Sequence, residues 1–272
     1  MPNSYQFSQI DAFADRPFAG NSAAVFVLDA WLDDALMQSI ALENNLSETA
    51  FVIPHDGGEA DYELRWFTPT VEVEMCGHAT LASGYEMLSR RPDLDRVRFQ
   101  TCKAGVLAVA RADNGALDMD LPVWASAPGE IAGLADELGG QPRAFRVRTD
   151  GARDSIIAIY DGESEIRALT PDFAKLAARG NLLYVATAPA DASQPYDIVS
   201  RVFVPGGGID EDPVTGSAHA FLAPYWRERL GRDRSGAFQA SARGGYLGMR
   251  CVGDRVILTG SCVKVIDGIF HI

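Results

Sequence analysis

The sequence contains one pattern twice, and this duplication is the feature that most restricts how the chain can fold. The first copy consists of NLSETAFV at 45–52, RWFTP at 65–69 and MCGHAT at 75–80. The second copy consists of NL at 181–182, RVFVP at 201–205 and VTGSAH at 214–219. In both copies the Asn-Leu pair precedes the arginine by twenty residues, and a small-residue turn then opens an apolar segment. We therefore expect two similar halves.

Hydrophobic patterns predict many short strands and few helices. Alternating apolar residues bounded by turn residues indicate strands at 5–13, 23–28, 50–54, 62–67, 97–101, 105–110, 144–147, 155–160, 182–186, 198–203, 246–252, 255–259 and 262–266. Helices are expected at 33–43, 77–88, 129–138, 171–179 and 217–230. In the helix at 171–179 we expect Thr170 as the cap and Pro171 at the first position. The simplest architecture is α+β, with the strands of each half wrapped around one buried helix.

The boundary between the halves is expected in the proline-containing stretch 121–128, which separates the two copies. We place the first half at 1–122 and the second at 123–261. A chain of 272 residues with 47% hydrophobic residues suits two domains of ordinary globular size.

Charge and cysteine usage exclude several classes of partner. A net charge of −13 repels nucleic-acid phosphates and anionic lipids, so neither nucleic acid nor a membrane is an expected partner. No apolar run approaches the ~20 residues that span a bilayer, and the N-terminus does not resemble a secretory signal. The four cysteines form no CxxC pair. We expect a reduced cytoplasmic protein.

The two small-residue turns indicate a site for a small anion. Gly77 and Gly216 come just before the two apolar helices, where a glycine lets backbone N–H groups approach a ligand closely. A helix N-terminus offers unpaired donors and a positive dipole end, which suits a carboxylate. Each glycine could instead serve only close packing, but the duplication favours the binding role.

Glu48 is the candidate general acid–base. In an extended segment its side chain shares a face with Ala50 and Val52, and a carboxyl group among apolar neighbours suits proton transfer near neutral pH. Counting along the repeat puts Tyr184 at the equivalent position. A carboxylate present in one half only favours a site role over a solvated strand end.

Other candidates flank the turns. His78 and Asp212 would complete three titratable groups around one pocket, although a core histidine and a capping aspartate are the ordinary alternatives. Cys76 is matched by Thr215, so the chain lacks the second thiol that a two-thiol racemase requires. No HExxH or Cys/His cluster indicates a metal, and no phosphate-binding loop indicates a nucleotide. We expect neither metal nor cofactor.

At these residues the chain resembles the phenazine-biosynthesis isomerase (PhzF-like) family over nearly its whole length. The resemblance is carried by DAFADRPFAGNSAAVFVLD at 11–29, ENNLSETAFV at 43–52, LRWFTPTVEVEMCGHATLAS at 64–83, DEDPVTGSAHAFLAPYW at 210–226 and QASARGGYLGMRCVGDRVILTGSCVKVIDG at 239–268. One departure is Ser22, where the family usually has proline.

This resemblance implies a diaminopimelate-epimerase-like fold. Each of two pseudo-symmetric halves would be a β-barrel around a central helix, with the active site in a cleft between them. The last strand, at about 262–272, would return to the first half, and homodimers are common in the family. The family's base corresponds to Glu48, and its other site residues correspond to His78, Asp212 and Ser217. The best-known activity is the cofactor-free isomerisation of dihydro-3-hydroxyanthranilate.

The resulting hypothesis is a cofactor-independent isomerase that moves a proton between carbons of a small carboxylated metabolite. Glu48 would transfer the proton, while His78 and Asp212 orient the substrate or handle a second proton. The substrate-binding candidates are Cys76, Gly77, Thr215, Gly216 and Ser217. Two alternatives stay open at this point: an amino-acid-type epimerase or racemase, and a non-catalytic small-molecule-binding protein of the same fold.

Overall fold

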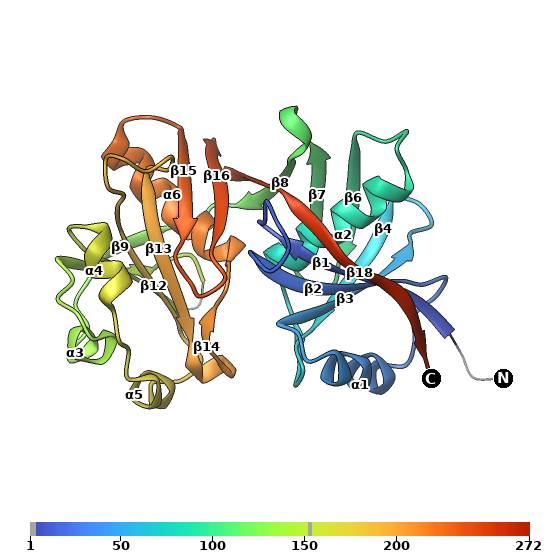
Figure 1. Cartoon of the computed structure of the whole chain (residues 1–272), viewed down its shortest axis with the longest axis horizontal. Coiled ribbons are helices and arrows are strands. Elements are labelled where there is room, and N and C mark those ends of the chain that lie inside the picture. Colours follow the sequence, from blue (N-terminus) through green and yellow to red (C-terminus); the bar gives the residue numbers. More distant parts are fainter. Residues whose placement is uncertain (1–3, 152–153) are drawn as a thin grey trace. The chain divides into compact units, whose positions relative to one another are not determined.

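The computed structural model describes residues 4–151 and 154–272, and its contacts divide the chain into two units (Figure 1). The first unit comprises 1–120 and 259–272, and the second comprises 121–258. Each unit has its own hydrophobic core, so each is described by itself.

In the part of the chain that the structure describes, the first unit contains one curved sheet and the helices α1 and α2. Its elements are β1 (Ser4–Ala12), β2 (Asn21–Val27), α1 (Asp34–Asn44), β3 (Glu48–Pro54), β4 (Tyr62–Phe67), β5 (Glu72–Val73), α2 (Gly77–Arg90), β6 (Arg96–Thr101), β7 (Val106–Arg111), the 3-10 turn η1 (Asp113–Gly115), β8 (Leu117–Pro122) and β18 (Cys262–His271). The C-terminal strand β18, red in Figure 1, lies antiparallel along β1, in blue.

Helix α2 is the centre of the first unit. Among the residues described for this unit, the strands pair in the order β18, β1, β2, β3, β4, β6, β7 and β8, and of these pairs only β2–β3 and β4–β6 are parallel. Strand β18, at one end of this order, and strand β7, next to last at the other end, both pack against α2. A sheet can touch one helix with both of its ends only by curving around it, so the sheet wraps α2.

The second unit repeats this plan. Its elements are β9 (Ser126–Gly129), α3 (Leu134–Leu138), β10 (Ala144–Arg148), β11 (Ser155–Ile159), α4 (Glu163–Ala168), α5 (Phe173–Ala178), β12 (Leu183–Pro189), β13 (Ile198–Val204), the 3-10 turn η2 (Pro205–Gly207), β14 (Ile209–Asp212), α6 (Gly216–Leu230), β15 (Arg234–Gln239), β16 (Gly245–Val252) and β17 (Arg255–Gly260).

Over seven strands, from β9 to β16, the pairing pattern of the second unit matches that of β18 to β7 in the first. Within the residues described for this unit the order is β9, β10, β11, β12, β13, β15 and β16, and of these pairs only β11–β12 and β13–β15 are parallel. Helix α6 packs against β15 and β16, and its Trp226 indole donates to Thr187 of β12. The predicted α+β fold with two pseudo-symmetric halves, each a sheet around a central helix, is therefore confirmed.

The structure also corrects several expected elements. The helix expected at 129–138 is only Leu134–Leu138, because Gly129 belongs to a strand that pairs with β10 and Gly133, at φ 76°, is the N-cap. The helix expected at 171–179 runs from Phe173 to Ala178, and its cap is the Asp172 side chain rather than Thr170. Strands β5, β8, β9, β14 and β15 and helix α4 were not expected.

No helix in residues 4–151 and 154–272 has both the length and the apolarity needed to cross a membrane.

Candidate active site

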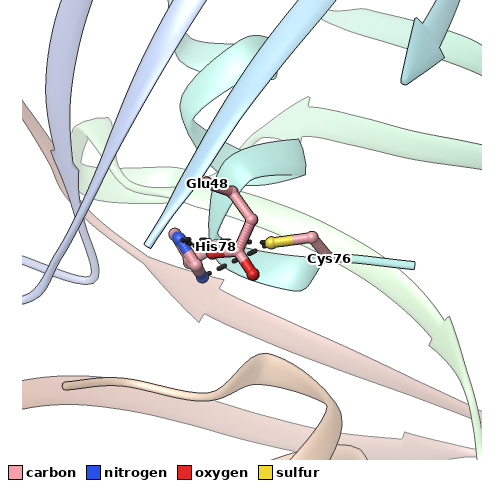
Figure 2. A group of neighbouring side chains, drawn as sticks. All are labelled: Glu48, Cys76 and His78. Carbon is pink, nitrogen blue, oxygen red and sulfur yellow. Dashed lines mark hydrogen bonds and ion pairs between the residues drawn. The ribbon is translucent and has the colours of Figure 1, made fainter. Parts of the chain in front are cut away.

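Three of the predicted site residues come together in the first unit. Glu48 is the first residue of β3, Cys76 is the N-cap of α2 and His78 is the second residue of α2. Strand β3 packs against α2, which brings the groups together (Figure 2). The Nε2 atom of His78 lies 3.0 Å from Oε2 of Glu48, and Sγ of Cys76 lies 3.5 Å from Nδ1 of His78.

This cluster is largely shielded from solvent. The His78 side chain is 4% exposed and the Glu48 side chain 13% exposed, so the carboxylate is the more accessible partner. Ala50 and Val52, which follow Glu48 on the same face of β3, are fully buried. The hydroxyl of Thr80 donates to the Cys76 carbonyl oxygen and fixes the start of α2.

Asn21 is a fourth member of the cluster, and sequence reasoning gave it no role. It is fully buried at the start of β2, and its amide lies 3.2 Å from Nδ1 of His78. Asn21 lies in the Gly-Asn-Ser stretch that carries part of the family resemblance. In that stretch Ser22 was named as a departure from the family, and Asn21 was not named as a candidate. The structure shows that β2 runs beside β3, with Ala23 opposite Glu48.

The loop before Asn21 is built to hold this position. Gly20 has φ +63°, and a Cβ atom there would lie 2.1 Å from the Ala12 carbonyl oxygen, so only glycine fits. The buried Asp11 carboxylate accepts from the Ser22 hydroxyl and from the Phe18 backbone N–H. These bonds fix the entry of the chain into β2.

Burial and neighbouring charges set the protonation states of the cluster. Burial raises the pKa of the Cys76 thiol to about 11, so the thiol is protonated near neutral pH. Burial opposes protonation of His78, but Cys76 and Glu48 outweigh it and raise the pKa of His78 well above its ordinary value. Because the thiol is neutral, the Glu48 carboxylate is the partner that holds a proton on His78 at pH 7.

The second unit holds the remaining candidates. Thr215 is the N-cap of α6, and Gly216 and Ser217 are its first two residues. The Thr215 hydroxyl donates to the Asp212 carboxylate. Gln239, which sequence reasoning also missed, donates to the Asp212 carbonyl oxygen at 2.6 Å and accepts from the Thr215 N–H at 2.9 Å. Gln239, the last residue of β15, therefore fixes the turn before α6 by these two hydrogen bonds.

Strand register corrects one equivalence between the copies. Thr49 lies opposite Phe67, and Tyr184 lies opposite Phe203, so Tyr184 matches Thr49 rather than Glu48. The structural counterpart of Glu48 is Leu183. Counting along the repeat was wrong by one residue. The asymmetry itself persists, because Leu183 also carries no ionisable group.

Helix starts provide the other equivalences. Cys76 and Thr215 are both N-caps, and His78 and Ser217 are both second residues of their helices. At the N-cap, the first unit therefore has a thiol where the second has a hydroxyl. At the second helical residue, the first unit has an imidazole where the second has a hydroxyl.

One group of described residues could hold a metal ion. Ligand atoms of Glu48, Cys76 and His78 all lie within 4.8 Å of one another. The sequence contains no metal-binding motif at these positions, because Glu48 reaches the other two only through the packing of β3 on α2.

The chain is similar to known proteins over nearly its whole length. A sequence model of the family described as phenazine biosynthesis-like protein matches residues 10–268. An uncharacterized isomerase of Pseudomonas aeruginosa is 47% identical over 266 residues, covering 97% of this chain and 98% of the relative.

Solved structures of the same family have the same fold. The crystal structure of a phenazine biosynthesis protein, PhzF family, from Enterococcus faecalis superposes with a TM-score of 0.88 at 37% identity, covering 99% of this chain and 100% of that one. A hydroxyproline epimerase from Agrobacterium vitis shares the fold, with a TM-score of 0.62 at 12% identity over 99% of this chain and 93% of that one.

Proposed function

Because this chain belongs to the phenazine biosynthesis-like family of isomerases, we propose that it moves a proton between two carbons of a small carboxylated metabolite, with Glu48 as the general acid–base and without a cofactor. The observation that carries this proposal is the shielded contact of 3.0 Å between Glu48 and His78.

The geometry supports a simple cycle of proton transfer. The Glu48 carboxylate takes a proton from a substrate carbon that lies next to a carboxylate or carbonyl group, and the electron pair left behind delocalises into that group. The protonated His78 ring then stabilises the negative charge that develops. Neutralising Glu48 removes its attraction to His78, which favours delivery of the proton to the second carbon. No proton is gained or lost overall.

For substrate binding we propose groups at the start of α2 in the first unit and, considered separately, at the start of α6 in the second. Backbone donors at Gly77 and at Gly216 and Ser217 suit carboxylate oxygens. Cys76 and Thr215 would line the bound metabolite as small N-cap side chains. Asp212 would orient the substrate or handle a second proton, as the family resemblance implies.

The substrate class follows from the same resemblance: small carboxylated metabolites, including cyclic compounds like dihydro-3-hydroxyanthranilate. A homodimer and a cytoplasmic location stay predictions.

Solvent exchange tests the role of Glu48. Wild-type protein is incubated in D2O with dihydro-3-hydroxyanthranilate and a panel of other small carboxylated metabolites, and deuterium at carbon is followed by NMR. Glu48→Gln keeps the shape of the side chain but removes the base, so we expect exchange to fall at least ~100-fold. The exposed Glu43→Gln serves as the matched control and should exchange as wild type does. Wild-type exchange by Glu48→Gln would overturn the mechanism.

The same experiment separates the alternative functions. Deuterium at a single inverted stereocentre would indicate an epimerase. The single thiol of the cluster argues against the two-thiol form of that reaction, since Thr215 occupies the position equivalent to Cys76. Tight binding of a metabolite without any exchange would indicate a binding protein that kept the fold.

A further inference from the structure

The cluster in the first unit combines three chemically different metal ligands. Glu48 supplies a carboxylate oxygen, Cys76 a sulfur and His78 an imidazole nitrogen, and all three ligand atoms lie within 4.8 Å of one another. Figure 2 shows the three side chains converging from β3 and from the start of α2. Proton transfer by Glu48 does not require this combination, so the sulfur in particular has no assigned chemistry.

The distances suit a zinc-sized ion. Zinc bonds of about 2.0 Å to nitrogen or oxygen and about 2.3 Å to sulfur place tetrahedral ligands roughly 3.3–3.6 Å apart. In the structure, Nε2 of His78 lies 3.0 Å from Oε2 of Glu48 and 4.0 Å from Sγ of Cys76. The Cys76 sulfur also lies 3.5 Å from Nδ1, so it has to turn towards Nε2. Since all three ligand atoms lie within 4.8 Å of one another, side-chain rotations that move them by about 1 Å would complete the geometry.

The surroundings of His78 match those of a metal-bound histidine. Metal ligands of this type usually have their other ring nitrogen held by a hydrogen bond, which fixes the ring. Here the buried Asn21 amide lies 3.2 Å from Nδ1 and leaves Nε2 directed at Glu48. Soft sulfur with imidazole favours zinc-like ions over Mg²⁺ and Ca²⁺, which prefer sites made of oxygen ligands.

We propose that Glu48, Cys76 and His78 form a three-ligand site for a thiophilic divalent cation of the zinc class, and that its occupation inhibits the enzyme. Binding releases the Cys76 thiol proton and the Nε2 proton of His78 to water, and the cation accepts the freed lone pairs without any redox change. The inhibitory effect rests on the proposed function, because the cation occupies the carboxylate that would take the substrate proton.

Cobalt spectroscopy tests the site without reference to activity. Co²⁺ titrated into the full-length protein should give a thiolate-to-metal charge-transfer band, and Zn²⁺ should abolish this band by displacement. Cys76→Ser should lose the band and weaken Zn²⁺ binding at least tenfold in competition with a chromophoric chelator. Cys102→Ser removes an exposed thiol and should behave as wild type.

A second variant keeps this test decisive if Cys76→Ser folds poorly. His78→Gln removes a nitrogen ligand and leaves the thiol in place, so Zn²⁺ affinity should again fall at least tenfold. Absence of the charge-transfer band in the wild type, or its retention in Cys76→Ser, would overturn the site.

Inhibition is measured separately by the D2O exchange assay. Zn²⁺ should stop exchange by wild type and by Cys102→Ser, a chelator should restore it, and Mg²⁺ should have no effect. A bound cation with undiminished exchange would overturn the inhibitory role. Activity of Glu48→Gln would instead contradict the proposed function and leave the cobalt result standing.

Discussion

At the scale of single residues, Asn21 is the most informative addition that the structure makes. A carboxamide can donate through its nitrogen or accept through its oxygen. Asn21 can therefore pair with Nδ1 of His78 whether that atom carries a proton or not. This adaptability suits a histidine whose protonation changes during turnover.

We predict that Asn21→Leu slows deuterium exchange by about 10–100-fold, which corresponds to a lost hydrogen bond of roughly 1–3 kcal/mol. Asn21→Asp keeps an acceptor for the protonated ring and should retain more activity than Asn21→Leu. The exchange rate at saturating substrate is the measurement. Equal activity of Asn21→Leu and wild type would contradict a positioning role.

His219 illustrates the opposite kind of buried histidine. Its Nδ1–H donates to the Thr215 carbonyl oxygen, and the Ser200 hydroxyl lies 3.2 Å from its Nε2. Burial lowers the pKa of His219 from 6.5 to about 4. The folded protein thus binds fewer protons here than the unfolded chain, so stability is present above pH 6.5 and is lost as the pH falls towards 4.

The expected loss at His219 is about 2 kcal/mol between roughly pH 7.5 and pH 5. Urea unfolding of wild type and of His219→Asn at both pH values measures it. The variant should lose about 2 kcal/mol less than wild type over this interval. The exposed His271→Asn is the control and should follow wild type. Identical pH dependence of His219→Asn and wild type would contradict the assignment.

At the scale of elements, the close contact between α2 and β7 depends on the absence of a side chain at Gly84. A Cβ atom on Gly84 would lie 2.4 Å from Cγ1 of Val109, far inside van der Waals contact. Alanine normally stabilises a helix by up to about 1 kcal/mol relative to glycine. Because of the clash with Val109, we expect alanine at position 84 to destabilise the protein despite its higher helix propensity.

We predict that Gly84→Ala destabilises the protein by about 1–3 kcal/mol, the usual cost of overpacking. Combining it with Val109→Ala should cost less than the sum of the two single changes, since the second change makes room for the first. Urea midpoints of the four proteins measure this coupling. A stabilised Gly84→Ala would show that the helix and strand separate easily.

Sequence patterns were sufficient to predict some helices and strands but not others. The helices expected at 77–88 and 217–230 are confirmed as α2 and α6, because long apolar segments after a glycine turn leave few alternatives. Strand β9 was missed, because it lies almost entirely in the stretch 121–128 that we expected as the boundary between the halves, and only its pairing with β10 identifies it. The shift from Tyr184 to Leu183 has the same origin: strand register is set between strands, not along one strand.

At the scale of the whole molecule, the last strand completes the first unit. Strand β18 pairs with β1, and its Lys264 reaches the buried carboxylate of Glu86 on α2 at 2.9 Å. Arg90 lies 2.7 Å from the other Glu86 oxygen. The end of the chain is thus tied to the central helix through a charge that is expensive to bury alone.

We predict that Lys264→Met destabilises the protein by about 1–3 kcal/mol, because one oxygen of Glu86 loses its partner. The pair formed by Lys103 and Glu74 is largely exposed, so the control Lys103→Met should cost no more than about 1 kcal/mol. Adding Glu86→Gln should recover part of the loss in Lys264→Met. Equal effects of the two lysine changes, measured by urea unfolding, would contradict this role.

Residue order was sufficient to predict the duplicated plan, the two central helices, and Glu48, Cys76 and His78 as candidate site residues. These follow from residue order and local periodicity, which are properties of the chain alone. Contacts between distant segments were needed to show that Asn21 lies against His78, that Gln239 fixes the turn at Asp212, and that Leu183 is the counterpart of Glu48. Those outcomes depend on strand pairing and helix packing between distant segments, and no local pattern encodes that register.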